Sequence, residues 1–481
     1  MLRLNKAALL LAAAVALLAL VAVACGGGDE EEGMATATPK PTGTAAATAT
    51  PKPTGTAAAT ATPKPTGTAA ATATPQPTET ATAAATATQP PAETPAATAT
   101  PPPAAGPVQG VTDTEIILGS HFAQSGTYGA SFSPVLNGFK AYINYVNEEK
   151  GGVCNRKINF TAIDDQYDPA LAVEAVRKLV EQEKIFALVI GLGTAAHSAV
   201  WDYLNEKGIP DLWAMTGAHK WGADPATHPW TVGILPDYFV EGTIFGKYIS
   251  ENFPGKKVTI IHQNDDYGKD ELAGLKNGLD PSKNELVSEQ SYETTAVDIR
   301  SQITNMKQTG AEVAVCACIP GYAAQAIKAA NNLGWKPQWF IGYVNSDPVM
   351  FSYASPEDME GTLTLQALKL ATFDDPAVVE HKRILSKYGN GPPGNFSIVG
   401  QVAGELMEKV LSDTCDNLTP DGLMSAVESI RDYQSELTLP GVTISVSDDD
   451  HVGFENMRFL RAKIVDGKGV WEYEGELMSF R

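Results

Sequence analysis

The chain has 481 residues, 43% of them apolar and 19% charged, which is enough apolar sequence for one or two buried cores. Its formal net charge is −21 at pH 7 and its pI is near 4.8. This acidity argues against nucleic acid and anionic membrane surfaces as partners, because both are bound through basic surfaces.

The first 24 residues have the layout of a signal peptide. Arg3 and Lys6 precede an uninterrupted apolar run over residues 7–24. An uncleaved transmembrane anchor is the alternative, since the run approaches the roughly 20 residues that span a bilayer. The small residues before Cys25 and the three glycines after it resemble a bacterial lipobox. This resemblance favours cleavage before Cys25 and attachment of a lipid to its thiol, with the folded part outside the membrane.

Residues 25–110 form a low-complexity segment. The sequence TATPKPTGTAAA occupies residues 36–47 and recurs at 48–59 and 60–71, with a degenerate copy from residue 72. A solenoid would need a hydrophobic face on every repeat, and these repeats have none. We therefore expect a disordered Thr/Pro/Ala tether, because such a sequence cannot offset the entropy lost on ordering.

From residue 111 the pattern changes to short apolar runs that alternate with helical periodicity, as in an α/β fold with parallel sheets. Strands are predicted at residues 115–119, 158–163, 185–192, 209–215, 257–263, 312–319, 338–342 and 362–367. Helices are predicted at residues 135–150, 169–182, 195–205, 238–252, 269–279, 298–309, 322–333, 377–388, 397–412 and 419–430. The tail over residues 437–474 is predicted to form strands and hairpins, with Asp466-Gly467 as a turn.

Several local strings in this order resemble one family, the type I periplasmic binding proteins of branched-chain amino acid (leucine, isoleucine and valine) ABC transporters. The strings are IILGSHFAQSGTYG from residue 116, GGVCNRKINFTAIDDQYDP from 151, GLGT from 191, KGIP from 207, MTGA from 215, NDDYG from 264, QAIK from 325 and GWKP from 334. The resemblance covers residues 111–474.

The resemblance implies two doubly wound α/β lobes joined by three crossovers, with the ligand at the carboxyl ends of the strands. Residues 111–232 and 367–453 would form one lobe, and residues 233–366 and 454–481 the other. It also implies a monomeric receptor without cofactor or metal, which captures a small carboxylate-bearing ligand and delivers it to an ABC permease.

Two glycine- and threonine-rich loops correspond to the segments of that family that bind the ligand carboxylate. They contribute Gly193 and Thr194, and Thr216 and Gly217. Backbone N–H groups and hydroxyls at a helix start are suitable donors to a carboxylate, although threonine is also an ordinary capping residue. By the same resemblance, Tyr128, Tyr267 and Tyr322 are expected in the cleft, and His219 is expected there because it follows the second of these loops. His219 has no second histidine at metal-binding spacing, so we expect it to form hydrogen bonds.

One position departs from the family pattern. Its amino-acid-binding members place a glutamate after the strand that corresponds to residues 338–342, where it pairs with the ligand ammonium. Here the loop has no glutamate, and Asn345 or Asp347 would have to accept from the ammonium. Branched-chain or related amino acids are therefore the leading prediction for the ligand, with deaminated acids as the alternative.

Four cysteines fall in the folded region. Cys154 and Cys415 lie in loops that the resemblance places together in lobe one, away from the cleft, and export favours a disulfide between them; two unpaired cysteines are the alternative. Cys316 and Cys318 lie on one face of a strand, where we expect packing rather than redox chemistry.

The sequence does not favour an enzyme. It contains no HExxH, no GxSxG, no P-loop and no CxxC motif. A surface sensor or attachment lipoprotein, with the same fold and no transport, is the alternative to a transport receptor.

Overall fold

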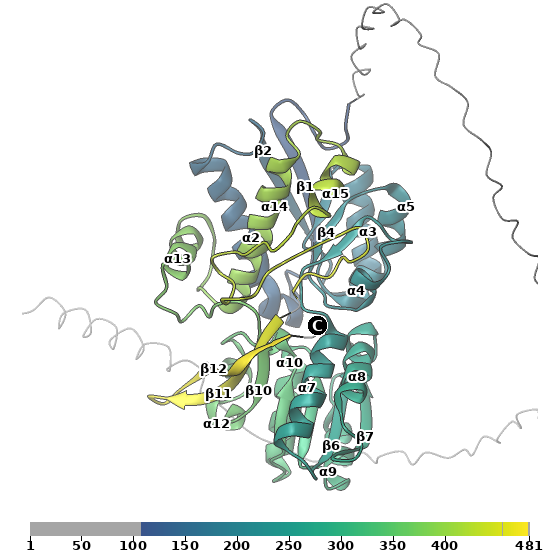
Figure 1. Cartoon of the computed structure of the whole chain (residues 1–481), viewed down its shortest axis with the longest axis vertical. Coiled ribbons are helices and arrows are strands. Elements are labelled where there is room, and N and C mark those ends of the chain that lie inside the picture. Colours follow the sequence, from purple (N-terminus) through teal and green to yellow (C-terminus); the bar gives the residue numbers. More distant parts are fainter. Residues whose placement is uncertain (1–106, 455, 480–481) are drawn as a thin grey trace, which may run out of the picture. The chain divides into compact units, whose positions relative to one another are not determined.

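The computed structural model describes residues 107–454 and 456–479, so the predicted signal peptide, Cys25 and the tether lie outside the described residues. The described part of the chain folds around one sheet of five strands and one of seven (Figure 1). We refer to each sheet with its helices as lobe one and lobe two.

Lobe one is built on a parallel sheet with the strand order β2-β1-β3-β4-β5. The first stretch of chain supplies β1 (Glu115–Phe122), α2 (Gly126–Glu149), β2 (Lys157–Asp164), α3 (Pro169–Glu181), β3 (Ala187–Val189), α4 (Thr194–Ser198), α5 (Trp201–Lys207), β4 (Asp211–Ala214), α6 (Lys220–Ala223) and β5 (Thr231–Gly233). The single helix predicted over residues 195–205 is two short helices, α4 and α5, and the strand predicted over 185–192 is shorter.

Lobe two is built on a sheet with the strand order β12-β11-β10-β9-β8-β6-β7, in which the strands from β10 to β7 are parallel. Its main stretch supplies α7 (Tyr238–Asn252), β6 (Lys257–Gln263), α8 (Asp266–Gly278), β7 (Glu285–Tyr292), α9 (Arg300–Gln308), β8 (Val313–Ala317), α10 (Pro320–Asn332), β9 (Gln338–Ile341), η1 (Tyr343–Asn345), α11 (Met350–Tyr353), α12 (Pro356–Met359) and β10 (Leu363–Gln366). Strand β7 is an edge strand with few buried residues, so its sequence has no apolar run that predicts it.

After β10 the chain returns to lobe one as three helices. They are α13 (Pro376–Tyr388), α14 (Asn395–Asp413) and α15 (Pro420–Val427), and α13 and α14 pack against α2. Gly138 and Gly400 allow α2 and α14 to approach closely, because a Cβ at Gly138 would meet the Ser397 carbonyl oxygen at 2.0 Å and one at Gly400 would meet that of Val135 at 1.9 Å. This approach brings Phe132 and Phe396, with ring centroids 5.6 Å apart, to one end of the helix pair.

The last segment returns to lobe two as a hairpin. Strands β11 (Asn456–Val465) and β12 (Lys468–Ser479) are antiparallel, and β11 pairs with β10. Asp466 and Gly467 form the predicted turn with φ angles of 50° and 73°. Residues 437–454 form only isolated bridges, so strands are absent from this described half of the predicted tail.

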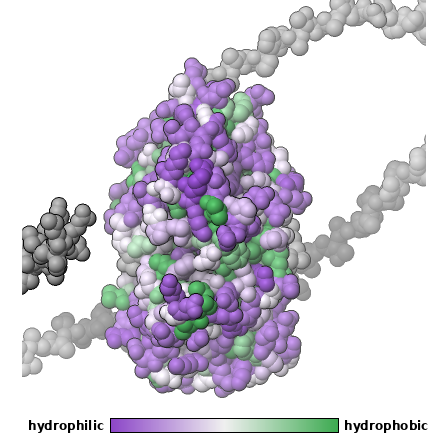
Figure 2. Space-filling model, turned by 90° about the vertical axis from the view of Figure 1, so that its left-hand side faces the viewer, coloured by the Kyte–Doolittle hydropathy of each residue, from purple (hydrophilic) through white to green (hydrophobic). Residues whose placement is uncertain are grey.

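The surface shown in Figure 2 is largely hydrophilic, with smaller hydrophobic areas. Among the described residues, the exposed large hydrophobic side chains are Val297, Leu333, Val379 and Val465, which belong to four separate segments. Scattered exposure of this kind does not by itself indicate an interface.

The structure contains two disulfides among the described residues. Cys154 and Cys415 are joined with their Cα atoms 5.2 Å apart, and this bridge ties the loop after α2 to the end of α14. Cys316 and Cys318 are joined as well, again with Cα atoms 5.2 Å apart, so the expectation that they only pack was wrong. Strand β8 ends at Ala317, and the bend there brings the two Cα atoms closer than the ~6.6 Å of an extended strand.

Candidate functional site

A cavity lies between the two lobes, where the carboxyl ends of their parallel strands face each other. It holds about 710 Å³ of empty space, some of it open to solvent. Lobe one and the crossovers line it with Phe132, Val135, Tyr167, Leu192, Gly193, Thr194, Met215, Leu235, Pro236, Ala367, Leu368, Phe396, Val399 and Phe454, and lobe two with Tyr238, Tyr267, Ile319, Tyr343, Val344, Ser346 and Gln366.

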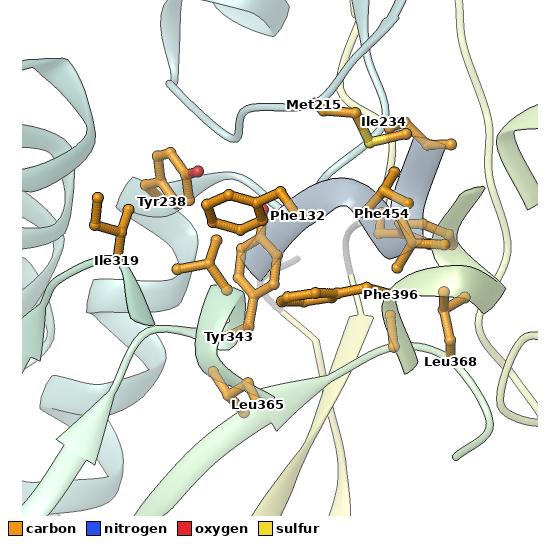
Figure 3. Close-up of a cluster of buried hydrophobic side chains, with 14 of the residues drawn as sticks. Phe132, Met215, Ile234, Tyr238, Ile319, Tyr343, Leu365, Leu368, Phe396 and Phe454 are labelled. Atoms are coloured by element: carbon orange, nitrogen blue, oxygen red, sulfur yellow. The ribbon is translucent and has the colours of Figure 1, made fainter. Parts of the chain in front are cut away.

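Aromatic rings form much of this cavity wall. Figure 3 shows Phe132, Phe396 and Tyr343 around one region, with Tyr238 and Phe454 on either side. Within lobe two, the rings of Tyr238 and Tyr267 have centroids 4.4 Å apart. Such a wall suits a ligand with an apolar body.

Thr194 supplies a hydroxyl group to the lobe one side of the cavity. It is the first residue of α4, and the preceding Gly193 has a φ of 95°, which favours glycine. The Thr194 and Thr216 hydroxyl oxygens are 2.7 Å apart, and the Thr216 oxygen also accepts from the Trp221 indole N–H at 3.3 Å and the Ala218 N–H at 3.4 Å. Either threonine hydroxyl can be the donor of this pair; if Thr216 donates, the hydrogen of Thr194 is available to a ligand.

Three of the predicted site residues lie on the cavity wall, namely Gly193, Thr194 and Tyr267. Thr216 is buried behind Thr194 and does not line the cavity. Gly217 lies beside the first crossover, where its carbonyl accepts from the Tyr238 N–H at 2.8 Å.

His219 and two of the predicted tyrosines lie outside the cavity. His219 is half exposed and donates from Nδ1 to Asp237 at 2.6 Å, and this hydrogen bond raises the pKa of His219. The Tyr128 and Tyr322 hydroxyls both donate to the Thr294 carbonyl, at 2.6 and 2.8 Å. Since Tyr128 belongs to lobe one and Thr294 to lobe two, Tyr128 links the lobes.

Asn345 is completely buried and is not among the residues that line the cavity, although Val344 and Ser346 on either side of it are. Its amide N–H group donates to the carbonyls of Cys318 at 2.8 Å and Gly342 at 2.9 Å. The side chain therefore ties η1 to the end of β8.

Further contacts join the lobes around the cavity. The Lys220 ammonium is 2.8 Å from Asp266, the His219 N–H donates to Asp270 at 2.8 Å, and the Ser131 and Tyr353 hydroxyls are 3.1 Å apart. Burial raises the pKa of Asp270 to about 6. These contacts hold the two lobes closed over the cavity.

Behind the lobe one wall lies a buried chain of ionisable groups. His121 Nδ1 donates to Asp165 at 2.7 Å, His197 Nε2 donates to Asp211 at 2.9 Å, and the other two ring nitrogens are 2.9 Å apart. All four side chains are inaccessible to solvent, and burial lowers the pKa of His121. These hydrogen bonds link the end of β1, the loop after β2, α4 and β4, and the two imidazole rings lie against Gly191, where a Cβ would be 2.6 Å from His121 Nε2 and His197 Nδ1.

Behind the lobe two wall lie two carboxyl groups, Glu241 of α7 and Glu271 of α8. Glu241 accepts from the Tyr343 N–H at 2.6 Å, and both residues are completely buried. Burial raises the pKa of Glu241 to about 7, and burial together with the neighbouring Glu241 raises that of Glu271 well above its usual value.

The aromatic lining residues Phe132, Tyr238, Tyr343, Phe396 and Phe454 were not predicted as site residues. Tyr343 directly follows a predicted strand, a position that could have identified it. Phe396 and Phe454 come from distant segments that reach the cavity only through the packing of α14 and the return of the chain to lobe two. No helix among residues 107–454 and 456–479 is long and apolar enough to span a bilayer, and no group of three or more metal-ligating side chains is found there.

Comparison with known proteins places this fold and cavity in context. Residues 115–469 match the model of a family described as periplasmic binding proteins. An amino acid binding protein of Pseudomonas aeruginosa is 25% identical over 256 residues, which is 48% of this chain and 62% of that protein. The chain thus spans somewhat less than two thirds of that relative's length.

Solved structures show the same fold. A branched-chain amino acid ABC transporter protein of Thermus thermophilus with bound valine superposes with a TM-score of 0.66 at 20% identity, over 76% of this chain and 96% of that one. A fatty acid ABC transporter substrate-binding protein of Thermomonospora curvata gives a TM-score of 0.66 at 21% identity, over 76% and 93% of the two chains. The predicted fold of two α/β lobes is confirmed.

Proposed function

Because the chain belongs to the periplasmic binding protein family, we propose that it is an extracytoplasmic receptor that captures a small, apolar, carboxylate-bearing solute between its lobes and delivers it to an ABC permease. The observation that carries the proposal is the cavity at the carboxyl ends of both sets of strands, which Thr194 lines. The relatives named above are binding proteins of transporters, and we propose that this chain likewise has no enzymatic activity.

The carboxylate would be bound on the lobe one side. There Thr194, the first residue of α4, would donate its hydroxyl hydrogen to the carboxylate, and its hydrogen bond with Thr216 would fix the position of the hydroxyl. The apolar part of the solute would lie against the aromatic rings and the aliphatic side chains of the opposite wall. Closure of the lobes on the solute, through contacts such as Lys220 to Asp266, would produce the shape that the permease recognises.

We further propose that Cys25 carries a lipid and that residues 26–110 connect it to the folded lobes. The receptor would then act as a monomer anchored by lipid to the extracytoplasmic side of the cell membrane. Labelling of growing cells with a radioactive fatty acid tests this part, because a Cys25→Ser variant should not incorporate the label.

The function itself is tested by a thermal-shift screen of the purified chain with amino acids, aliphatic acids, aromatic acids and amides. A solute that binds only the folded state raises the melting temperature as its concentration rises. At least one carboxylate-bearing solute should do so, and uptake of that solute by the source cells should fall when the gene is deleted. No stabilisation by any carboxylate in the screen would contradict the proposal.

A further inference from the structure

No charged side chain occurs among the residues that line the cavity in the described part of the chain. An α-amino acid brings an ammonium group, and burying that group without an acceptor of opposite charge is strongly unfavourable. The identity of the ligand therefore depends on whether a carboxylate close behind the wall can reach the cavity.

Asp347 directly follows the lining residue Ser346, but its carboxylate already accepts two hydrogen bonds from backbone N–H groups. It accepts from the Val349 N–H at 2.9 Å and from the Phe396 N–H at 2.9 Å at the start of α14. Its side chain is 2.7 Å from the position that a Cβ at Gly394 would take, so it points toward α14. The Asp347 carboxylate therefore joins the end of η1 to the start of α14 and does not face the cavity as a free acceptor.

Glu241 and Glu271 lie on the helices that contribute Tyr238 and Tyr267 to the wall, yet neither residue lines the cavity. Glu241 already accepts from the Tyr343 N–H, and the two buried carboxyls retain protons to unusually high pH because no cation compensates them. Asp237, next to the lining residue Pro236, is paired with His219 and caps α7 through the Phe239 N–H at 2.7 Å.

Neutral acceptors do not replace a carboxylate here. The Gln366 side-chain oxygen accepts from the N–H groups of Ala367 and Leu368, at 2.9 and 3.2 Å, and its amide N–H donates to Ser346 at 2.9 Å. Asn345 Oδ1 is buried without a partner among the described residues, but Asn345 does not line the cavity. The Tyr343 hydroxyl on this wall is buried without a hydrogen-bond partner among the described residues, but a neutral phenol does not compensate the charge of an ammonium.

From these contacts we infer that the ligand is an apolar carboxylic acid without an α-ammonium group, such as a branched aliphatic or aryl-substituted acid. This inference rests on the proposed function and specifies the chemical class of the solute. The carboxylate lies toward Thr194, and the carbon that bears an ammonium in an amino acid lies against uncharged wall.

Titration calorimetry of the full chain with matched pairs tests the inference. The pairs are leucine with 4-methylpentanoate and phenylalanine with 3-phenylpropanoate, which differ only in the ammonium. In at least one pair the acid should bind 10-fold or more tightly than the amino acid. Equal or tighter binding of the amino acids would overturn the inference while leaving the proposed function intact.

Failure of both members of both pairs to bind would also overturn the inference. The thermal-shift screen then decides separately whether the proposed function survives, since stabilisation by another carboxylate-bearing solute would preserve it.

A charge placed on the wall provides an independent test. Ser346→Asp puts a carboxylate at a lining position, where it can still accept from the Gln366 amide, and Ser346→Asn is a control of the same size without the charge. Relative to Ser346→Asn, the Asp variant should shift the affinity ratio at least 10-fold toward the amino acid. Equal ratios in the two variants would contradict the inference.

Discussion

The two walls of the cavity differ in what they present to a ligand and in what is buried behind them. Lobe one presents the Thr194 hydroxyl, and behind it His121 and His197 are each bonded to an aspartate. Lobe two presents tyrosine rings, and behind them Glu241 and Glu271 are buried without a cation. Both walls have ionisable groups buried behind them, but only in the first does each carboxylate accept a hydrogen bond from a histidine.

This difference explains why the cavity is polar at one end and uncharged at the other. A buried carboxylate keeps its charge when it is paired and fully hydrogen-bonded, and otherwise it binds a proton. Asp165 accepts from His121, and Asp211 accepts from His197 and from the Thr231 hydroxyl, so this cluster ties β1, α4 and β4 together. Burial keeps Glu271 protonated to high pH and raises the pKa of Glu241 to about 7, and neither residue lines the cavity, so the tyrosine wall presents no carboxylate to an ammonium.

Breaking the paired cluster should have the largest effect. His197→Ala removes the donor to Asp211 and the neighbour of His121, and the loss of one partner from a buried pair costs about 3–5 kcal/mol. Urea unfolding measures this loss. Lys256→Met, which breaks the half-exposed pair with Glu312, is the control and should cost under about 1 kcal/mol. Similar losses in the two variants would show that the histidine chain is not a structural support.

The unpaired cluster should appear as a pH dependence of stability. The folded state raises the pKa of Glu241 from its ordinary 4.5 to about 7, so its contribution to the free energy of unfolding is present at low pH and is lost as pH rises through about 7. In Glu241→Gln this decline between pH 5 and pH 8 should become shallower. His121 acts in the opposite direction, because its lowered pKa removes stability as pH falls below 6.5. A decline of unchanged steepness in Glu241→Gln would contradict the assignment.

The polar end of the cavity can be tested through Thr194. Thr194→Val removes the hydroxyl and should weaken binding of a carboxylate by roughly 1–3 kcal/mol, because a buried charged acceptor loses a donor. Thr216→Val should weaken binding too, since Thr216 orients the Thr194 hydroxyl. The matched control is Thr414→Val, a buried threonine of lobe one that does not line the cavity and should affect only stability. Unchanged calorimetric affinity in both Thr194→Val and Thr216→Val would refute this placement of the carboxylate.

The smallest effect is expected where the two walls are joined at the surface. Lys220→Met removes the ion pair with Asp266, whose side chains are 27% and 44% exposed, and should weaken binding by at most about 1 kcal/mol. Because such pairs are screened by salt, the difference from the wild type should shrink in 1 M NaCl. A difference that grows with salt would exclude this pair as a closing contact.

The sequence predicted the fold well because the apolar periodicity of buried parallel strands is a local signal. Gly193, Thr194 and Tyr267 directly follow such strands, so strand ends alone brought them close to the cavity. Their contact with a ligand stays a prediction. The edge strand β7 carries no apolar run and was missed for that reason.

Other features depend on packing that no local pattern records. Phe396 reaches the cavity because Gly138 and Gly400 let two helices touch, and these residues are far apart in the chain. The choice between Asn345, which points into the protein, and its neighbour Ser346, which lines the cavity, depends on the short helix η1. Pairing of Cys316 with Cys318 depends on where β8 ends.

The central claim is that a single solute binds in the cavity between the lobes. Val344→Trp places a large side chain at a lining position and should fill part of the space. Calorimetric titration of the wild type with leucine and 4-methylpentanoate should give one binding site per chain for the tighter of the two ligands. The Val344→Trp variant should show no measurable binding, and its cooperative unfolding should show that it is still folded. If that variant does not fold, Val399→Trp on the opposite wall replaces it. Wild-type affinity in a folded cavity-filling variant would contradict the claim.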